Sequence, residues 1–499
     1  MASTALSAWP RTSPRTLPVA EGLVLTVVAL LIRLPHFGDP SFMIDEQFYL
    51  VAGDQLLHGH LPFTEVWDRK PIGLFLIYAV AAAFGSGAII AYQIIATLCA
   101  SATAWVIARI ARPMAGTIAG CVAGLLYLLW IELAEGGGGQ SAIFYNLPVA
   151  LAGWCVLRAG GMREEDAVRR SAFAAMVLTG IAIQIKYTVV FEGMFFGLML
   201  AWQTLVRLPI GAALRRISLL AATALAPTAL VFAFYAAIGQ ANAFIFANFT
   251  SIFLRSPADA AEMPYRIEMF ALRLVPFLVC IAASLWQVRM RSDLAAARWR
   301  VFMIGWCGAA LIGIFGIGTL YSHYILPAFV PLTIAAAPIF RRPTSGPVLA
   351  FFLAWMPAVT LHWPDFARTE RHRAEIAALT ALIPPEVKTG CMQMFDGPPI
   401  LYWTSHACTL TRFIFPDHLS AANEERAIGV DPVIELRRVL AQRPAAITIS
   451  DQDIRPPDVR TFAVMRAALA RDYVLAGKAP HDGRDIEVWV PRRLHAPQV

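Results

Sequence analysis

Charged residues are scarce in this 499-residue chain. Asp, Glu, Lys and Arg together make up 15% of it, whereas hydrophobic residues make up 58%. This composition lies well outside the range of ordinary soluble domains. With a mean hydropathy of +0.59, most of the chain is expected to lie in a lipid bilayer, so the sequence predicts a polytopic membrane protein.

Several catalytic signatures are missing as well. The sequence contains neither a P-loop nor a dinucleotide fingerprint, because its glycine run, Gly136–Gly139, does not follow a strand. It also lacks the cysteine–histidine spacing of a metal site and the nucleophile elbow of a hydrolase. The residues therefore indicate no cofactor, and they leave the use of a divalent metal open.

Cysteines are few, and most have a simple explanation. Five of the seven lie inside apolar runs, where they are expected to act as small packing residues: Cys99, Cys121, Cys155, Cys280 and Cys307. Only Cys391 and Cys408 lie in a polar region. These two would pair in an oxidising compartment, but their spacing leaves a disulfide open.

Long apolar runs dominate what is present. Eleven of them approach the length that a helix needs to cross a membrane. They are Leu17–Leu34, Ala88–Ile110, Pro113–Ile131, Ala142–Leu157, Ser171–Ile185, Val189–Val206, Ile217–Ile238, Phe270–Val288, Val301–Leu320, Ile325–Phe340 and Pro347–Leu361. The net charge of +7 comes from arginines clustered between these runs, which predicts orientation against a membrane rather than nucleic-acid binding.

A twelfth run, Ile72–Phe84, is shorter than the roughly 17 to 25 residues of a membrane span. If it does not cross, the loops on one side carry seventeen basic residues, Arg11 and Arg15 included, and the loops on the other side carry seven. Counting it as a span would destroy this asymmetry. The positive-inside rule therefore predicts a cytoplasmic N-terminus and a juxtamembrane or re-entrant helix at Ile72–Phe84.

An odd number of crossings then places the tail outside the cytoplasm. The tail alternates strand-like runs (Cys391–Phe395, Leu410–Phe415, Ala446–Ser450 and Ile486–Val490) with helix-like runs (Pro399–Ser405, Pro432–Gln442 and Thr461–Ala470). The predicted fold is a polytopic α-helical membrane protein of about 11 transmembrane helices with a small C-terminal α/β extracytoplasmic domain. The predicted domains are residues 1–363, with a first outer loop at 35–87, and residues 364–499.

The first outer loop holds the strongest candidates for chemistry. Asp45 and Glu46 follow the first span, and the spacing of Asp45 and Tyr49 puts both side chains on one face of a helix. A solvated acidic loop is the alternative explanation. Because Asp68, Arg69 and Lys70 follow in the same loop, acids and phosphate-binding cations are expected together, which favours a functional site.

The segment Trp67–Pro71 closes this loop. Its functional interpretation is that Lys70, and with it Arg69, meets an anionic phosphate at the headgroup level. The alternative is membrane anchoring by an interfacial aromatic residue beside snorkelling cations.

Two later outer segments carry further candidates. Lys186 stands between two apolar runs, so it either lines a polar cavity or snorkels from a helix end. Tyr321-Ser322-His323-Tyr324 ends another crossing, where His323 either donates to a phosphate oxygen or belongs to an aromatic belt. Glu132 and Glu135 precede the glycine run in a loop that would line the same cavity.

Together these motifs resemble the bacterial GT-C glycosyltransferases, specifically the protein mannosyltransferase and lipid A aminoarabinose transferase branch. The elements that carry the resemblance are Asp45-Glu46, Trp67–Pro71, Lys186, Tyr321–Tyr324, Leu401-Tyr402-Trp403 and Thr411-Arg412-Phe413. The resemblance covers most of the membrane region, and the tail resembles the variable extracytoplasmic domain of bacterial members.

This resemblance implies an inverting transfer of a sugar from a polyprenyl-phosphate carrier to an acceptor at the periplasmic face of the inner membrane. Asp45 takes the position of the acid that acts as general base or orients the acceptor, with Glu46 beside it, and Lys70 matches the lysine that faces the donor phosphate. Asp68, Arg69, Lys186, Tyr321, His323 and Tyr324 are the further substrate-binding candidates. The expected partners are a lipid-linked sugar donor, the membrane and a glycan, lipid or protein acceptor.

Two positions depart from the family pattern. In the aminoarabinose transferases that this chain resembles, a carboxylate stands directly before the lysine, whereas this chain has Arg69 there. Relatives also often carry an acid near the start of the helix after the second outer loop, where this chain reads Gln140–Asn146. The alternative function is a polytopic transporter or lipid flippase, for which charges near the middle of helices would be expected.

Overall fold

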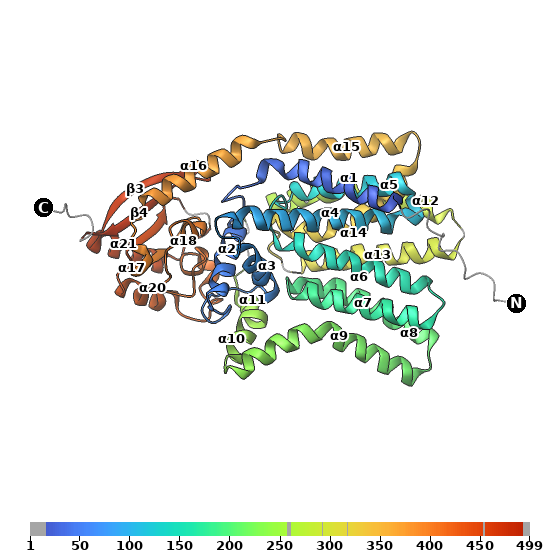
Figure 1. The fold of residues 1–499 in the computed structure, drawn as a ribbon, viewed down its shortest axis with the longest axis horizontal. Coiled ribbons are helices and arrows are strands. Elements are labelled where there is room, and N and C mark those ends of the chain that lie inside the picture. Colours follow the sequence, from blue (N-terminus) through green and yellow to red (C-terminus); the bar gives the residue numbers. More distant parts are fainter. Residues whose placement is uncertain (1–15, 257–260, 292, 317, 453–454, 493–499) are drawn as a thin grey trace. The chain divides into compact units, whose positions relative to one another are not determined.

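The computed structural model describes residues 16–256, 261–291, 293–316, 318–452 and 455–492, so Arg11 and Arg15 lie outside the described residues. The chain, whose helices and strands are labelled in Figure 1, divides into two compact units. Unit 1 comprises Met1–Pro35, Ile94–Val231 and Ala260–Asp365, and unit 2 comprises His36–Gln93, Phe232–Asp259 and Phe366–Val499. Helices dominate and a small sheet lies in the C-terminal region, which confirms the predicted fold class.

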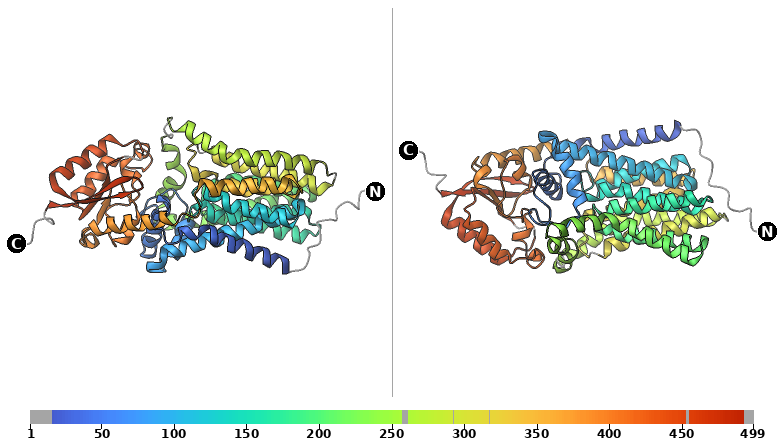
Figure 2. Two further views of the ribbon diagram at one scale, coloured as in Figure 1. Left: turned by 90° about the horizontal axis from the view of Figure 1, so that it is seen from above. Right: turned by 60° about the horizontal axis from the view of Figure 1, so that its bottom comes forward.

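Unit 1 is helical, and its helices run side by side (Figure 2). They are α1 (Thr16–Arg33), α4 (Ala88–Ala115), α5 (Thr117–Glu132), α6 (Ser141–Gly161), α7 (Glu165–Ile183), α8 (Val190–Arg207), α9 (Ile210–Ala237), α12 (Met263–Arg289), α13 (Leu294–Phe315), α14 (Phe329–Ala336) and α15 (Ser345–Thr360). The first six residues of α4 and the last six of α9 belong to unit 2.

Helices occupy all eleven predicted runs, but the structure does not establish eleven crossings. Within the described residues, eight helical segments are long and apolar enough to cross a membrane. The three helices in the remaining runs, α5, α7 and α15, do not meet both conditions. The fold is therefore that of a multi-pass membrane protein, and the count of eleven stays a prediction.

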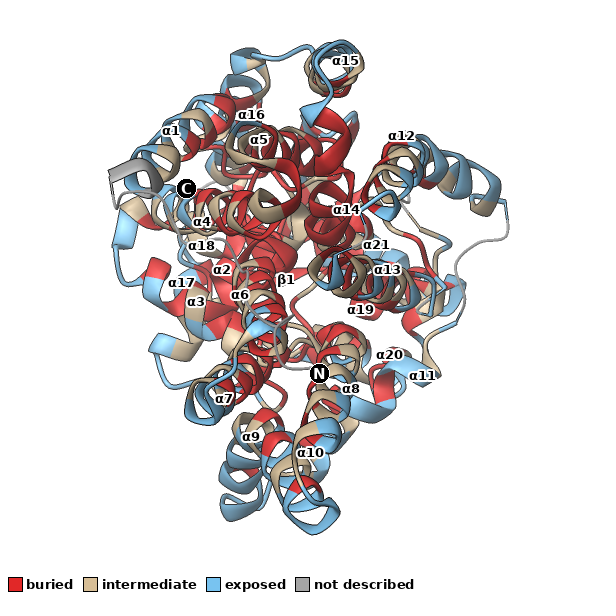
Figure 3. Cartoon of the chain, turned by 90° about the vertical axis from the view of Figure 1, so that its right-hand side faces the viewer, coloured by how far each residue is buried: buried red, intermediate tan, exposed pale blue. Residues whose placement is uncertain are grey.

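Burial distinguishes the centre of unit 1 from its periphery. The span Ser322–Arg341, which contains α14, is 83% buried within the protein, whereas the span formed by α9 is only 11% buried. Figure 3 shows the same contrast between a buried α14 and a largely exposed α9. Because the exposed residues of α9 include Leu214, Leu225 and Leu230, this helix presents an apolar surface suited to lipid.

Small residues allow α4 and α5 to pack closely. Gly120 and Gly124 lie one turn apart on α5, and a Cβ atom added at either would come within 2.7 Å or 2.6 Å of the carbonyl oxygen of Ala108 or Ala104. Such small-xxx-small pairs let helix backbones approach each other in membranes.

An ion pair joins the start of α1 to the end of α4 in unit 1. Glu21 near the start of α1 lies 3.3 Å from the guanidinium of Arg112 near the end of α4, so the two helices are antiparallel. An even number of crossings therefore separates them. This agrees with the prediction that Ile72–Phe84 does not cross, and the helix found there, α3 (Ile72–Ala82), has only 11 residues.

Unit 2 combines short helices with a four-stranded sheet. Its helices are α2 (Ile44–Leu57), α3, α10 (Ala241–Ile245), α11 (Ser251–Leu254), α16 (Phe366–Leu382), α17 (Val387–Gly390), α18 (Ile400–Thr404), α19 (Asp417–Ser420), α20 (Pro432–Ala441) and α21 (Val459–Asp472). Its strands are β1 (Met392–Met394), β2 (Ala446–Ser450), β3 (Tyr473–His481) and β4 (Arg484–Pro491), in the order β1-β2-β4-β3. β1 and β2 are parallel, and the other pairs are antiparallel.

The predicted strand Leu410–Phe415 is wrong, because the described residues form no strand there. Its backbone instead reaches other segments, as when the carbonyl of Arg412 accepts the amide of Trp67 at 2.9 Å. Strand β3 and helix α16 were not predicted. β3 contains Pro480 and a bulge near Gly477, and it lies at the edge of the sheet, where proline is tolerated.

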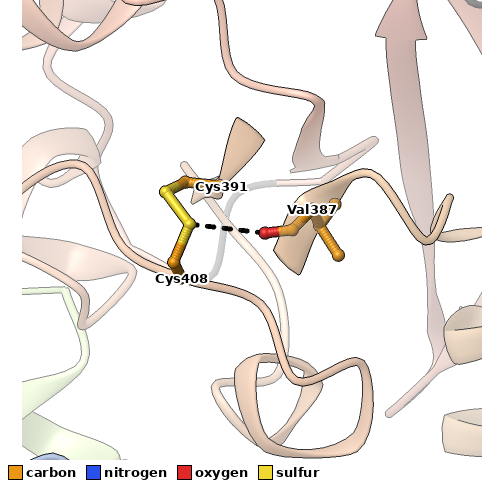
Figure 4. The surroundings of a disulfide bond; sticks show 3 residues. All are labelled: Val387, Cys391 and Cys408. Carbon is orange, nitrogen blue, oxygen red and sulfur yellow. Dashed lines mark hydrogen bonds between the residues drawn. A yellow bond between two sulfur atoms is a disulfide. The ribbon is translucent and has the colours of Figure 1, made fainter. Parts of the chain in front are cut away.

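Cys391 and Cys408 form a disulfide with a Cα–Cα distance of 4.4 Å (Figure 4). It joins the residue before β1 to the loop after α18, and the carbonyl of Val387 accepts the backbone amide of Cys408 at 3.2 Å. The pairing that the sequence left open is thus present in the structure.

The compact units differ from the predicted domains at the first outer loop. Trp67 is 1% exposed and belongs to the same apolar core as Phe413, Leu436 and Ile447 of the tail. This packing groups His36–Gln93 with the tail instead of with the helices of unit 1. The change from the first long region to the tail falls at Asp365, close to the predicted boundary.

Candidate functional site

Helix α2 in unit 2 positions the first candidate acid. Asp45 is the second residue of α2 and is half-buried, and Tyr49 follows one turn later with an exposed fraction of 1%. The electrostatic field of Asp45 acts on both Tyr49 and Asp68. Asp45 and Tyr49 lie one turn apart on α2, as predicted, and Asp45 is near Asp68, which comes later in the same loop.

The end of the same loop brings Lys70 to this cluster. The Lys70 ammonium lies 5.3 Å from the centre of the Tyr49 ring and 3.9 Å from the carboxylate of Asp68. Asp45 and Lys70, which are 25 residues apart in the sequence, thus influence the same two side chains. We call Asp45, Tyr49, Asp68 and Lys70 the loop cluster.

Burial determines the proton affinities in the loop cluster. It raises the pKa of Asp68, and the cation of Lys70 and the backbone amide of Arg69 oppose this rise. Burial also holds the pKa of Tyr49 well above its ordinary value. The phenol of Tyr49 therefore stays protonated at neutral pH and is able to donate a hydrogen bond to an anion.

Glu46 has different surroundings from its neighbour Asp45. Its side chain is fully buried, and its charge acts on the phenol of Tyr92. Adjacent residues on a helix point about 100° apart, which separates Glu46 from the loop cluster. The two predicted catalytic acids therefore lie in different environments.

Arg69 also faces away from the loop cluster. Its Nε donates to Ser251 Oγ at 2.7 Å, its guanidinium pairs with the carboxylate of Glu424, and it stacks 4.7 Å above the Trp67 ring. Glu424 is almost completely buried and also pairs with Arg255 at 2.9 Å. The arginine that replaces the family's carboxylate is thus engaged by other parts of unit 2.

Unit 1 holds the second set of candidates. The Lys186 ammonium lies 4.5 Å above the ring of Tyr324. Lys186 and Tyr324 line a small cavity of about 10 Å³ together with Tyr145, Thr188 and Glu192. This volume suits about one water molecule, so the cavity provides a polar environment for Lys186.

His323 lies in a row of aromatic residues. Its ring stacks against Tyr321 at 6.1 Å and meets Tyr324 edge-on at 4.9 Å. Its Nδ1 lies 3.0 Å from a carboxylate oxygen of Glu135, and the guanidinium of Arg266 lies 4.5 Å from the centre of the Tyr321 ring. The structure thus brings Lys186, Tyr321, His323 and Tyr324 together within unit 1.

A buried arginine holds the glycine loop that carries Glu135. Arg33 is 1% exposed, lies 3.3 Å from Glu132, and donates to the carbonyl oxygens of Gly136 and Gly138. Glu135 itself has a φ of 63°, which is uncommon for a residue with a side chain. The loop is therefore fixed in a defined conformation, and Glu135 is directed to His323.

Glu192 and Arg33 were missed as contributors to these groups. Glu192 is buried in the first turn of α8, where its carboxylate accepts the indole N–H of Trp306 at 2.6 Å. An acid within an apolar run was the available signal. Among the described residues, no group of three or more His, Cys, Asp or Glu side chains is arranged to hold a metal ion.

Comparisons with solved structures identify similar folds. The crystal structure of ArnT from Cupriavidus metallidurans bound to undecaprenyl phosphate matches with a TM-score of 0.62 and 17% identity, covering 97% of this chain and 99% of that chain. The apo structure of the same protein matches with a TM-score of 0.59 over the same shares of the two chains. An oligosaccharyltransferase from Archaeoglobus fulgidus is more distant, with a TM-score of 0.44 and 10% identity over 79% of this chain.

These matches show the fold over nearly the whole chain. The resemblance to GT-C glycosyltransferases is therefore confirmed at the level of the fold. No protein-family model matches the sequence, and no curated protein sequence matches it either.

Proposed function

We propose that this protein, with the fold of ArnT, is a glycosyltransferase that takes a sugar from a polyprenyl-phosphate carrier. The observation that carries the proposal is the match along 97% of the chain to an ArnT structure bound to undecaprenyl phosphate. The loop cluster supports it, because an acid, a phenol and a lysine side by side suit proton transfer and phosphate binding. The proposed location is the periplasmic face of the inner membrane.

In the proposed reaction, the bond between the anomeric carbon and the carrier phosphate breaks while the acceptor oxygen bonds to that carbon. The leaving phosphate gains negative charge, which the Lys70 ammonium stabilises more strongly in the transition state than in the bound donor. Tyr49 is added to the proposed donor site, because its protonated hydroxyl lies in the same cluster.

Asp45 is the proposed general base. It accepts the proton of the acceptor hydroxyl as the new bond forms, and attack opposite the leaving phosphate inverts the anomeric configuration. Asp45 suits this role better than Glu46, because Asp45 is a half-buried member of the loop cluster whereas Glu46 is fully buried near Tyr92.

Lys186 and His323 of unit 1 are proposed as substrate-binding residues, with Tyr321 and Tyr324 supporting them. The close packing of Lys186 on Tyr324 supports a role beyond snorkelling at a helix end, because it orients the ammonium. The pairing of His323 with Glu135 likewise fixes the imidazole ring. Arg69 is left out of the proposed donor site because its guanidinium binds Glu424.

Gene deletion tests the proposal and identifies the substrate together. We expect the deletion strain to lack one sugar on a surface glycan, as measured by mass spectrometry, and the wild-type gene to restore it. The Asp45→Asn variant should fail to restore it, because loss of a general base typically lowers a rate by about 10² to 10⁴-fold.

The matched control is Asp54→Asn, an acid on the same helix that pairs with His58 at 3.4 Å. This variant should restore the sugar fully at equal protein levels. Full restoration by Asp45→Asn would remove Asp45 from the proposed role, and an unchanged glycan profile in the deletion strain would contradict the transferase itself.

A further inference from the structure

The segment Trp67–Pro71 sends alternate side chains to two places within unit 2. Trp67 enters the apolar core and Arg69 stacks on its ring, whereas Asp68 and Lys70 contact each other beside Tyr49. The backbone is held at one end by the bond from the Trp67 amide to Arg412 and at the other by Pro71, which precedes α3. Only residues 68–70 lie between these two fixed points.

On the buried side of this segment, Arg69 contacts Glu424. It lies in a short helical turn, Ala422–Glu424, and its side chain is 2% exposed. Both of its oxygens bind Arg69, and one of them also lies 2.9 Å from Arg255. The two guanidinium groups hold the pKa of Glu424 at about 2 despite its burial, so the carboxylate is charged at neutral pH.

Hydrogen bonds extend this contact to a third segment of unit 2. Ser251 accepts the Arg69 Nε–H and donates its own hydroxyl hydrogen to the carbonyl of Ala427, three residues after Glu424. The backbone amide of Ser256 donates to the carbonyl of Asn423 at 3.2 Å. Arg69 is therefore fixed from both sides, by α11 and by the turn that carries Glu424.

We propose that Glu424 is a positioning residue that holds Lys70 in place through Arg69. The tail would then be part of the donor-binding apparatus and not a separate module. The inference rests on the proposed function only in assigning Lys70 to the donor phosphate. It also gives a physical role to Arg69, the residue that stands where the family's pattern has a carboxylate.

The consequence of removing the Glu424 charge follows from the arrangement of cations. Without it, Arg69 and Arg255 lose the carboxylate that both of them contact, and the two like charges repel in a poorly solvated place. Arg69 then moves toward solvent and takes residues 68–70 with it. Loss of Arg255 alone has no such effect, because Arg69 and Glu424 remain as a neutral pair.

Lysine labelling of the purified full-length protein in detergent tests this directly. The chain has only four lysines, Lys70, Lys186, Lys388 and Lys478, so an amine-reactive reagent gives a simple peptide map by mass spectrometry. We expect the labelling rate of Lys70 to rise several-fold in Glu424→Gln. The rates of Lys388 and Lys478, which are exposed on the tail, should not change.

Two control variants separate positioning from general damage. Glu435→Gln removes another tail glutamate that pairs with an arginine, Arg438, and Arg255→Gln removes the second cation from Glu424 itself. Both should leave the labelling of Lys70 near the wild-type rate. In an Arg69→Gln background, where Lys70 is already released, Glu424→Gln should add nothing further.

Binding of undecaprenyl phosphate to the same variants links positioning to function. We expect the Kd to weaken about tenfold in Glu424→Gln, as for loss of an interaction between charged groups, and to stay unchanged in Glu435→Gln. Equal Lys70 labelling in wild type and Glu424→Gln would overturn the inference. Failure of the wild type to bind the lipid, with labelling still responding, would count against the proposed function and leave the positioning role standing.

Discussion

At the scale of single residues, adjacent residues of similar chemical type lie in different surroundings. Asp45 and Glu46 are both acids, yet Asp45 is half-buried and acts on Tyr49 and Asp68, whereas Glu46 is fully buried and acts on Tyr92. Arg69 and Lys70 are both cations, yet only Lys70 belongs to the loop cluster. Residue type and spacing identified the candidate segment, but they did not indicate which member of each pair belongs to the loop cluster.

His418 provides a prediction at this scale. It is 4% exposed and lies 4.7 Å from the Trp67 ring, with Phe413 and Phe415 also around it. Burial lowers the pKa of His418 to about 3, so the folded protein stays unprotonated at this site where the unfolded chain, with a pKa near 6.5, takes up a proton. Stability from this residue is therefore lost as the pH falls from about 6.5 toward 3.

His418→Phe should remove this sensitivity. When the pH falls from 7 to 5, the wild type is expected to lose about 2 kcal/mol more unfolding free energy than the variant. Burial raises the pKa of Asp417 to about 6, so this residue gains stability as the pH falls and opposes the effect of His418. Because both proteins contain Asp417, its effect cancels when the pH dependence of the unfolding free energy is compared between them. Thermal unfolding of both proteins at the two pH values measures it, and parallel shifts in Tm would show that His418 does not carry the effect.

At the scale of elements, hydrophobic periodicity and turn residues predicted most helices correctly. The predicted run Pro432–Gln442 corresponds to α20, and Ala446–Ser450 coincides with β2. Leu410–Phe415 failed because its apolar side chains Phe413 and Ile414 are buried by packing and not by strand pairing. A short apolar run cannot reveal this difference, because burial in a loop and burial in a sheet give the same pattern.

Close helix packing leads to a prediction at the scale of elements. Gly124→Ala should destabilise the protein, because the new Cβ would lie 2.6 Å from the carbonyl oxygen of Ala104 and would push α5 away from α4. Overpacking of this kind typically costs about 1–3 kcal/mol. The variant should show a lower Tm in detergent.

Gly197→Ala is the matched control, because this helical glycine of α8 has no atom within 4 Å of the added Cβ. It should be neutral or slightly stabilising, since alanine favours the helix. Equal Tm values for the two variants would mean that α4 and α5 do not pack through Gly124.

At the scale of the whole molecule, loop charge and apolar length predicted a helical membrane region followed by a small α/β tail. They did not predict that the first outer loop packs with that tail, because this grouping depends on contacts between segments more than 300 residues apart, such as Trp67 with Phe413. The same long-range pairing joins Arg69 to Glu424. A single sequence identifies the local character of such segments but not their partners.

The disulfide tests the proposed orientation of the whole chain. If the tail lies outside the cytoplasm, Cys391 and Cys408 should be oxidised in cells, because disulfides persist in oxidising compartments. Alkylation of the denatured protein without reductant should then modify Cys280, which is free, and spare Cys391 and Cys408 until reductant is added. Replacing both with alanine should lower stability by about 3 kcal/mol, as expected for a closed loop of this length. Alkylation of Cys391 and Cys408 without reductant would place the tail in a reducing compartment and reverse the proposed topology.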